Sequence, residues 1–139
     1  MFSLLRKFFI FIRGFIGSNY PDVIIDFIFN EGLFFISIKN IGKKSAYRIS
    51  IQFDNKIYGV EGKKEISSLS LFNKIEFLPP KKEIITFLDT SISYFRCDNP
   101  TMISANIRYY DCYDVKYNRV IKHDLEIYRE IGFIGKYHN

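Results

Sequence analysis

The stretch AYRISIQFD, residues 46–54, decides the fold, because its side chains alternate between apolar and polar along the chain. The alternating sets are Tyr47, Ile49, Ile51 and Phe53 on one side, and Arg48, Ser50, Gln52 and Asp54 on the other. Successive side chains of an extended chain point to opposite faces, so a period of two is typical of a strand with one buried face. The stretch therefore predicts a β-strand that places its apolar set in a core.

Strand-like sequence continues on both sides of this stretch. MISANIRYYD (residues 102–111) shows the same alternation, whereas DVIIDFIFN (22–30) and LFFISIKN (33–40) are more continuously apolar and rich in β-branched and aromatic residues. The link between the last two, Asn30-Glu31-Gly32, predicts a hairpin turn, since glycine adopts a positive φ without strain.

Further strands are expected over 71–78, 83–89 and 115–127, with a short helical turn at 90–96 and a hairpin loop at 110–114. Pro79-Pro80 ends the first of these strands, because proline lacks the N–H that a sheet ladder needs. Strand-like runs that recur about every 10–15 residues with turn signals between them are typical of an antiparallel β-sandwich. An all-β fold of roughly seven or eight short strands is therefore predicted.

The length of 139 residues suits a single domain with its own core. We expect the chain to divide into an amphipathic helix over residues 1–18, a β-sandwich over 19–131 and a C-terminal tail over 132–139.

Three stretches resemble immunoglobulin-like modules of the CARDB type. IKNIGKKSAYRISIQFD (38–54) resembles their Asn-x-Gly turn before an alternating strand, FLPPKKEIITF (77–87) their Leu-Pro-Pro segment, and ISANIRYYDCYDVKY (103–117) their strand with a Tyr-x-Asp hairpin. The resemblance covers roughly residues 21–128. It implies an immunoglobulin-like antiparallel β-sandwich, preceded in this chain by the N-terminal amphipathic helix.

The chain departs from CARDB-type modules in two loops. Lys44-Ser45 stands where Gly-Pro is common, and Asp114 stands where the hairpin often has glycine. Modules that resemble this one generally support adhesion, assembly or presentation, often behind an N-terminal membrane anchor, and they are not usually catalytic. The resemblance therefore implies a non-enzymatic interaction or structural module.

The opening segment MFSLLRKFFIFIRGFIG (residues 1–17) separates into two faces when it is placed on a helix at about 100° per residue. The polar side, an arc of roughly 120°, holds Ser3, Arg6, Lys7, Arg13, Gly14 and Gly17. The opposite, apolar side holds Met1, Phe2, Leu4, Leu5, Phe8, Phe9, Phe11, Ile12, Phe15 and Ile16, and Ile10 alone falls on the polar side. The segment therefore predicts an amphipathic helix that ends near Gly17-Ser18.

Four locations are open to such a helix: a membrane interface, a protein partner or second copy, the protein's own sandwich, or a degenerate signal or span. A span needs about 20 apolar residues, and Arg13 near its middle would cost about 2.5–3.5 kcal/mol. A secretory signal needs about 7–15 uninterrupted apolar residues and a small-residue cleavage site, whereas here Arg13 follows directly after Ile12. A basic, phenylalanine-rich helix suits the membrane interface.

The residues expected to bind a membrane or a partner are Phe2, Leu5, Arg6, Lys7, Phe8, Phe9, Ile12, Arg13, Phe15 and Ile16. On an anionic membrane the apolar side chains enter the acyl boundary, and each basic side chain near the lipid phosphates contributes about 1 kcal/mol. This predicts a peripheral membrane protein. The alternative is a cytoplasmic, ligand- or nucleic-acid-binding sandwich whose helix closes its own core.

The net charge of +5 does not indicate a broad nucleic-acid footprint. Of the 20 lysines and arginines, three lie in residues 1–17, which contain no acidic residue, and the other 17 stand against 15 acidic residues. The doublets Lys43-Lys44, Lys63-Lys64 and Lys81-Lys82 fall in expected loops, where lysines commonly solubilise turns and protect sheet edges. The charge distribution therefore argues against nucleic acid as a partner.

Residues that often carry chemistry are few. His123 lies in an expected strand with no nucleophile indicated near it, and Asp111 and Asp114 lack the Asp-x-Asp-x-Asp spacing of calcium loops. Cys97 and Cys112 flank a strand that spans about 35 Å, which favours free thiols over a bridge. We expect no catalytic residue, metal, cofactor or small-molecule substrate.

Tyrosines cluster at the expected hairpin around residues 109–117. Tyrosine is common in binding surfaces because it brings a large contact area at low entropic cost. Tyr110 and Tyr113 are the two expected to lie outside the core as contact residues.

Overall fold

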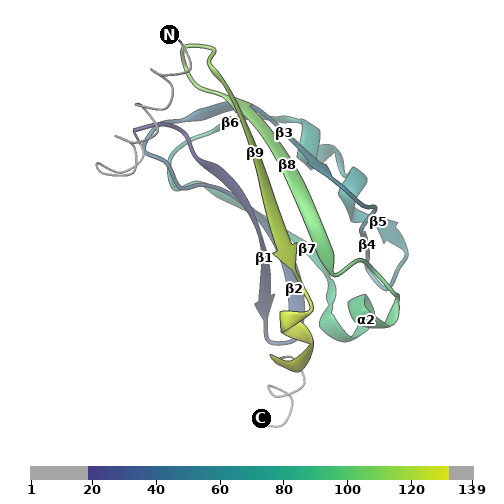
Figure 1. Ribbon diagram of the computed structural model, residues 1–139. Coiled ribbons are helices and arrows are strands. Elements are labelled where there is room, and N and C mark those ends of the chain that lie inside the picture. Colours follow the sequence, from purple (N-terminus) through teal and green to yellow (C-terminus); the bar gives the residue numbers. More distant parts are fainter. Residues whose placement is uncertain (1–18, 132–139) are drawn as a thin grey trace.

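The computed structural model describes residues 19–131, which form two antiparallel sheets packed against each other (Figure 1). The predicted helix over 1–18 and the tail over 132–139 lie outside the described residues. The all-β prediction is confirmed in this form: antiparallel sheets of three and four strands enclose a hydrophobic core.

The first sheet has the strand order β1-β2-β7 and the second has the order β6-β3-β8-β9. The strands of the first sheet are β1 (Val23–Asn30), β2 (Leu33–Asn40) and β7 (Glu83–Thr90). The strands of the second are β6 (Ile75–Leu78), β3 (Ala46–Phe53), β8 (Met102–Tyr110) and β9 (Lys116–Asp124). Smaller elements are the ribbon of β4 (Tyr58–Gly59) with β5 (Lys64–Glu65), the 3₁₀ turns η1 (Ile66–Ser68) and η2 (Ser70–Asn73), the helix α2 (Ser91–Arg96), and helical residues 127–131.

The inner faces of the two sheets supply the core through the expected period of two. In β8, Ile103, Ala105, Ile107 and Tyr109 are all buried, as the alternation predicts. The hairpin between β1 and β2 is also confirmed, because Glu31 and Gly32 both adopt a positive φ, as a two-residue type I′ turn requires. The helical turn predicted at 90–96 is α2.

The alternation in β3 breaks at one point. Arg48 has a φ of +50°, and the pairing of β3 with β8 shifts register between Tyr47 and Ser50. This bulge turns Tyr47 to the outer face, where it pairs with Tyr110, and leaves Ala46, Ile49 and Ile51 inside. The prediction that Tyr47 belongs to the core set was therefore wrong.

Two predicted strands are shorter than expected. Only residues 75–78 of the stretch 71–78 are a strand, because η2 folds Phe72 into the core against Phe53, with 5.0 Å between ring centroids. The strand predicted over 115–127 ends at Asp124, whose carboxylate accepts the N–H of Glu126 at 3.0 Å and begins the helical turn.

One open side of the sandwich is closed by side chains that cross from β9 and the following turn to β1. Arg119 pairs with Asp22, the Nε2–H of His123 donates to the carbonyl of Ile25 at 3.0 Å, and the hydroxyl of Tyr128 donates to the carbonyl of Phe27 at 3.5 Å. Figure 1 shows β9 lying beside β1 along this seam. His123 is therefore a structural residue.

The end of the sandwich at which β1 begins is tied by the buried amide of Asn40. Its Oδ1 accepts the N–H groups of Asp22 and Gly42, at 3.1 and 2.9 Å. Its Nδ2 donates to the carbonyls of Lys44 and Leu78, at 2.8 and 3.0 Å. One side chain thus joins the start of β1, the turn before β3 and the end of β6.

Replacing this amide tests its contribution to stability. Asn40→Ala leaves two N–H donors and two carbonyls without their partner in a buried place, so the free energy of unfolding should fall by about 2–4 kcal/mol. Urea denaturation followed by circular dichroism measures this change. Asn118→Ala, at an exposed position of β9, is the matched control and should change stability by less than about 0.5 kcal/mol. Equal effects of the two substitutions would contradict the assignment.

Candidate functional site

The hairpin between β8 and β9 is built on Asp111. Its Oδ1 accepts the N–H groups of Tyr113 and Val115, at 2.8 and 3.0 Å, and its Oδ2 accepts the hydroxyl of Tyr117 at 3.0 Å. This Asx turn fixes the loop and leaves its tip in solvent, where Tyr113 is 85% exposed. Asp111 is therefore occupied in holding the hairpin.

Arg48 reaches this hairpin from the bulge in β3. Its guanidinium carbon lies 4.1 Å from the centroid of the Tyr110 ring, and its Nη2 lies 2.5 Å from Oδ1 of Asp114. Tyr110 is therefore partly covered, whereas Tyr113 is open. We call Arg48, Tyr110, Tyr113 and Asp114 the hairpin surface.

An aromatic row continues from the hairpin surface across the outer face of the four-stranded sheet. Tyr47 is paired with Tyr110 on one side and with Phe77 on the other, and the Tyr47 and Phe77 centroids are 5.4 Å apart. Sequence reasoning missed Tyr47 and Phe77 as surface residues. The bulge at Arg48 that turns Tyr47 outward leaves no mark in the residue pattern.

A second exposed surface covers the outer side of the three-stranded sheet, and we call it the outer apolar face. Its apolar members are Ile24 and Ile28 of β1, Leu33 and Phe35 of β2, and Ile85 and Phe87 of β7. Ile28, Phe35 and Phe87 lie in register across the three strands, and the rings of Phe35 and Phe87 meet edge to face at 5.8 Å. Ile85 is 51% and Phe87 is 41% exposed.

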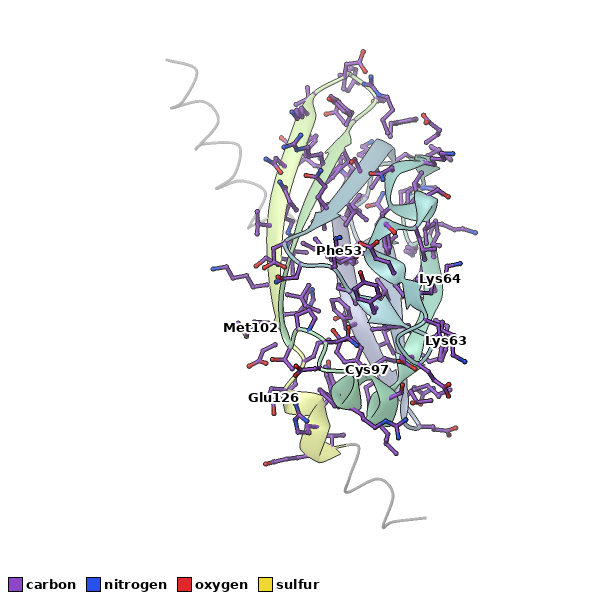
Figure 2. All side chains as sticks on the ribbon, turned by 90° about the vertical axis from the view of Figure 1, so that its right-hand side faces the viewer. Phe53, Lys63, Lys64, Cys97, Met102 and Glu126 are labelled. Carbon is purple, nitrogen blue, oxygen red and sulfur yellow. The ribbon has the colours of Figure 1, made fainter. Side chains whose placement is uncertain are left out.

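The two thiols lie at opposite ends of β8. Cys97 and Cys112 are both free and exposed, as expected. Figure 2 shows Cys97 at the end of α2, on the same side of the molecule as Lys63 and Lys64. A side chain at Gly62 would meet the sulfur of Cys97 at 3.4 Å, so the loop between β4 and β5 packs directly on this thiol.

Carboxylates in the described part of the chain act mainly as turn acceptors. Asp89 is buried and accepts the N–H groups of Glu61 and Thr90, at 3.2 and 2.8 Å. Within residues 19–131 no group of three His, Cys, Asp or Glu side chains is placed to hold a metal ion. Over the same residues no helix combines the length and the apolar character that crossing a membrane requires.

A comparison with known protein families matches residues 16–129 to the domain of unknown function DUF8453. The chain belongs to this family. No curated protein and no solved structure gave a match. The matched part of the DUF8453 chain includes both described surfaces, whereas residues 1–15 precede it.

The residues predicted for attachment, from Phe2 to Ile16, lie outside the described residues, so their role stays a prediction. Tyr110 and Tyr113 are brought together with Arg48 and Asp114 at one hairpin, and their role as contact residues likewise stays a prediction.

The ionisation of the Tyr117 hydroxyl makes the stability of the hairpin depend on pH. Burial, together with the hydrogen bond and negative charge of Asp111, raises the pKa of Tyr117 above its usual value, and burial also raises the pKa values of Tyr94 and Tyr128. The contribution of the protonated Tyr117 hydroxyl to stability is therefore complete below the unfolded-state pKa of about 10. It is lost as pH rises through the folded-state pKa.

The free energy of unfolding should consequently decline above about pH 10, and Tyr117→Phe should make that decline shallower. Urea denaturation at a series of alkaline pH values measures both slopes. Identical slopes for the wild type and the variant would contradict the coupling.

Proposed function

We propose that this DUF8453 protein is a non-enzymatic interaction or structural module with an immunoglobulin-like sandwich. Among its seven longer strands in chain order, the first, second and fifth form one sheet, and the third, fourth, sixth and seventh form the other. Constant-type immunoglobulin modules place strands A, B, E and D in one sheet and C, F and G in the other. The first, second and fifth strands here match A, B and E, and the third, sixth and seventh match C, F and G, whereas the fourth strand lies beside the third instead of in the D position. This division supports the class, and the resemblance of the turn sequences to CARDB-type modules agrees with it.

The observation that carries the proposal is the outer apolar face. A sheet with one solvated side ordinarily alternates apolar residues inside with polar residues outside. Here large apolar side chains at register positions of all three strands face outward, with Leu33, Ile85 and Phe87 more than a third exposed. Contiguous exposed apolar surface of this kind marks an interaction site.

Attachment to an anionic membrane surface, or to a larger assembly, is assigned to residues 1–17. The support is their sequence: ten large apolar residues on one arc and Arg6, Lys7 and Arg13 on the other. The proposed location is therefore the membrane periphery. In this proposal the β-body presents its surfaces to a protein partner while the opening segment holds it in place.

Vesicle flotation tests the attachment. Full-length protein should float with vesicles of phosphatidylcholine and phosphatidylglycerol, and less with phosphatidylcholine alone, because the basic arc requires anionic lipid. Phe9→Glu places a charge on the apolar arc and should abolish flotation. Ser3→Glu makes the same change of charge on the polar arc, and this matched control should still float, although more weakly. Equal flotation of both variants would refute attachment through the apolar arc.

A further inference from the structure

We propose that in solution the outer apolar face is covered by residues 1–17 of the same chain, so that this segment has two alternative seats, its own sheet and the membrane. The inference deepens the proposed function and rests on it, since it assigns the unbound position of the same apolar arc. Three observations support it. The three-stranded sheet carries apolar residues on both sides, the described chain begins beside one end of that sheet, and the segment and the sheet face carry net charges of opposite sign.

The three-stranded sheet has the residue pattern of a sheet covered on both sides. Its inner side is buried through residues such as Ile25, Ile36 and Leu88, which are at most 1% exposed. Its outer side carries Ile28, Phe35 and Phe87 in one cross-strand row. Strands with apolar residues on both faces are typical of sheets that are packed on both faces.

The four-stranded sheet differs, and it provides an internal comparison. The middle of its outer face pairs Ser50 with Arg108 and Gln52 with Asn106. Polar residues at these positions are what a solvated outer face requires. The middle of this outer face is therefore polar, and its exposed apolar side chains, such as Phe77 and Val120, lie on the two edge strands.

The point where the described chain begins favours the opening segment as the cover. Residues 20–22 are packed so tightly against the turn after β2 that a Cβ at Gly42 would lie 2.1 Å from the carbonyl oxygen of Tyr20. The chain therefore enters beside the end of β2 that carries Lys39 and Asn40. A segment preceding Asn19 can fold back from there over the sheet.

The dimensions match. Seventeen helical residues extend over about 25 Å, and an eight-residue strand extends over about 27 Å. Three strands with about 4.8 Å between neighbours are roughly as wide as one helix, at about 10 Å. One helix therefore covers the face from its Lys39 end to its Leu33 end.

The segment and the face carry net charges of opposite sign. Asp26 and Glu83 lie exposed on the outer side of the sheet, where Lys39 is the one opposing basic residue. Residues 1–17 carry Arg6, Lys7 and Arg13 and no acidic residue. The net charge of the segment is therefore opposite in sign to that of the face, although the apolar arc, not the basic side chains, would contact the sheet.

Tryptophan fluorescence tests the covering, because the chain contains no tryptophan and a single introduced one reports alone. In the full-length Ile85→Trp variant, emission should be blue-shifted and acrylamide quenching weak. Adding Phe9→Glu should shift the emission to the red and raise the quenching constant several-fold. Adding Ser3→Glu in place of Phe9→Glu should leave both close to the full-length values.

Two further probes keep the result specific. Leu33→Trp, at the far end of the same face, should respond in the same way as Ile85→Trp, and it replaces that probe if Ile85→Trp fails to fold. Val120→Trp lies on the outer side of the other sheet, where Val120 is 59% exposed, and should not respond to Phe9→Glu.

The inference is overturned if the probe on the outer apolar face is as accessible in the full-length chain as in the Phe9→Glu variant. A blue shift that disappears on dilution would also overturn it, because a second copy would then be the cover. Flotation with an accessible probe rejects this inference and keeps the membrane attachment. A covered probe without flotation keeps this inference and rejects the membrane attachment.

Discussion

The fold depends on a constraint at Asn40: a carboxamide sealed from water must satisfy both its donors and its acceptor within the protein. It does so by bonding to the backbone at the start of β1, in the turn before β3 and at the end of β6. Because these segments belong to both sheets, the amide sets how the sheets meet at this end. The same bonds fix where the chain enters β1, and thus the direction from which any preceding segment approaches.

The outer sides of the two sheets differ in how polar and apolar side chains are distributed. The four-stranded sheet has a polar middle and one aromatic end, with Arg48 lying on Tyr110, and its exposed Phe77 and Val120 lie on its two edge strands. The three-stranded sheet has apolar side chains outside as well as inside, and burial of that outer surface contributes free energy roughly in proportion to its area. The proposed interaction role therefore rests on the three-stranded sheet more than on the four-stranded sheet.

Much of the architecture can be predicted from sequence because it follows from local rules. The alternation in 102–111 gives the inward residues of β8, and Glu31-Gly32 gives the first hairpin. Other features depend on tertiary packing, which a residue pattern does not record. The bulge at Arg48 moves Tyr47 outward, and Phe72 enters the core from a 3₁₀ turn instead of a strand.

The candidate surfaces divide in the same way. Tyr113 can be located because a hairpin tip exposes its residues, and Tyr110 because the alternation of β8 places it on the outer face, whereas Phe77 joins their row only through sheet register. The continuous apolar runs in 22–30 and 33–40 do carry the signal of a sheet apolar on both sides. That signal can be interpreted only once the structure shows that the four-stranded sheet covers just one side of the three-stranded sheet.

The seam between β9 and β1 has a consequence for self-association. The outermost strand of a sheet offers unpaired carbonyl and amide groups that can recruit a strand from another molecule and start a fibril. In β1 the carbonyls of Ile25 and Phe27 are already engaged by His123 and Tyr128. Side chains of the same molecule therefore occupy carbonyl groups that a strand from another molecule would need in order to pair with β1.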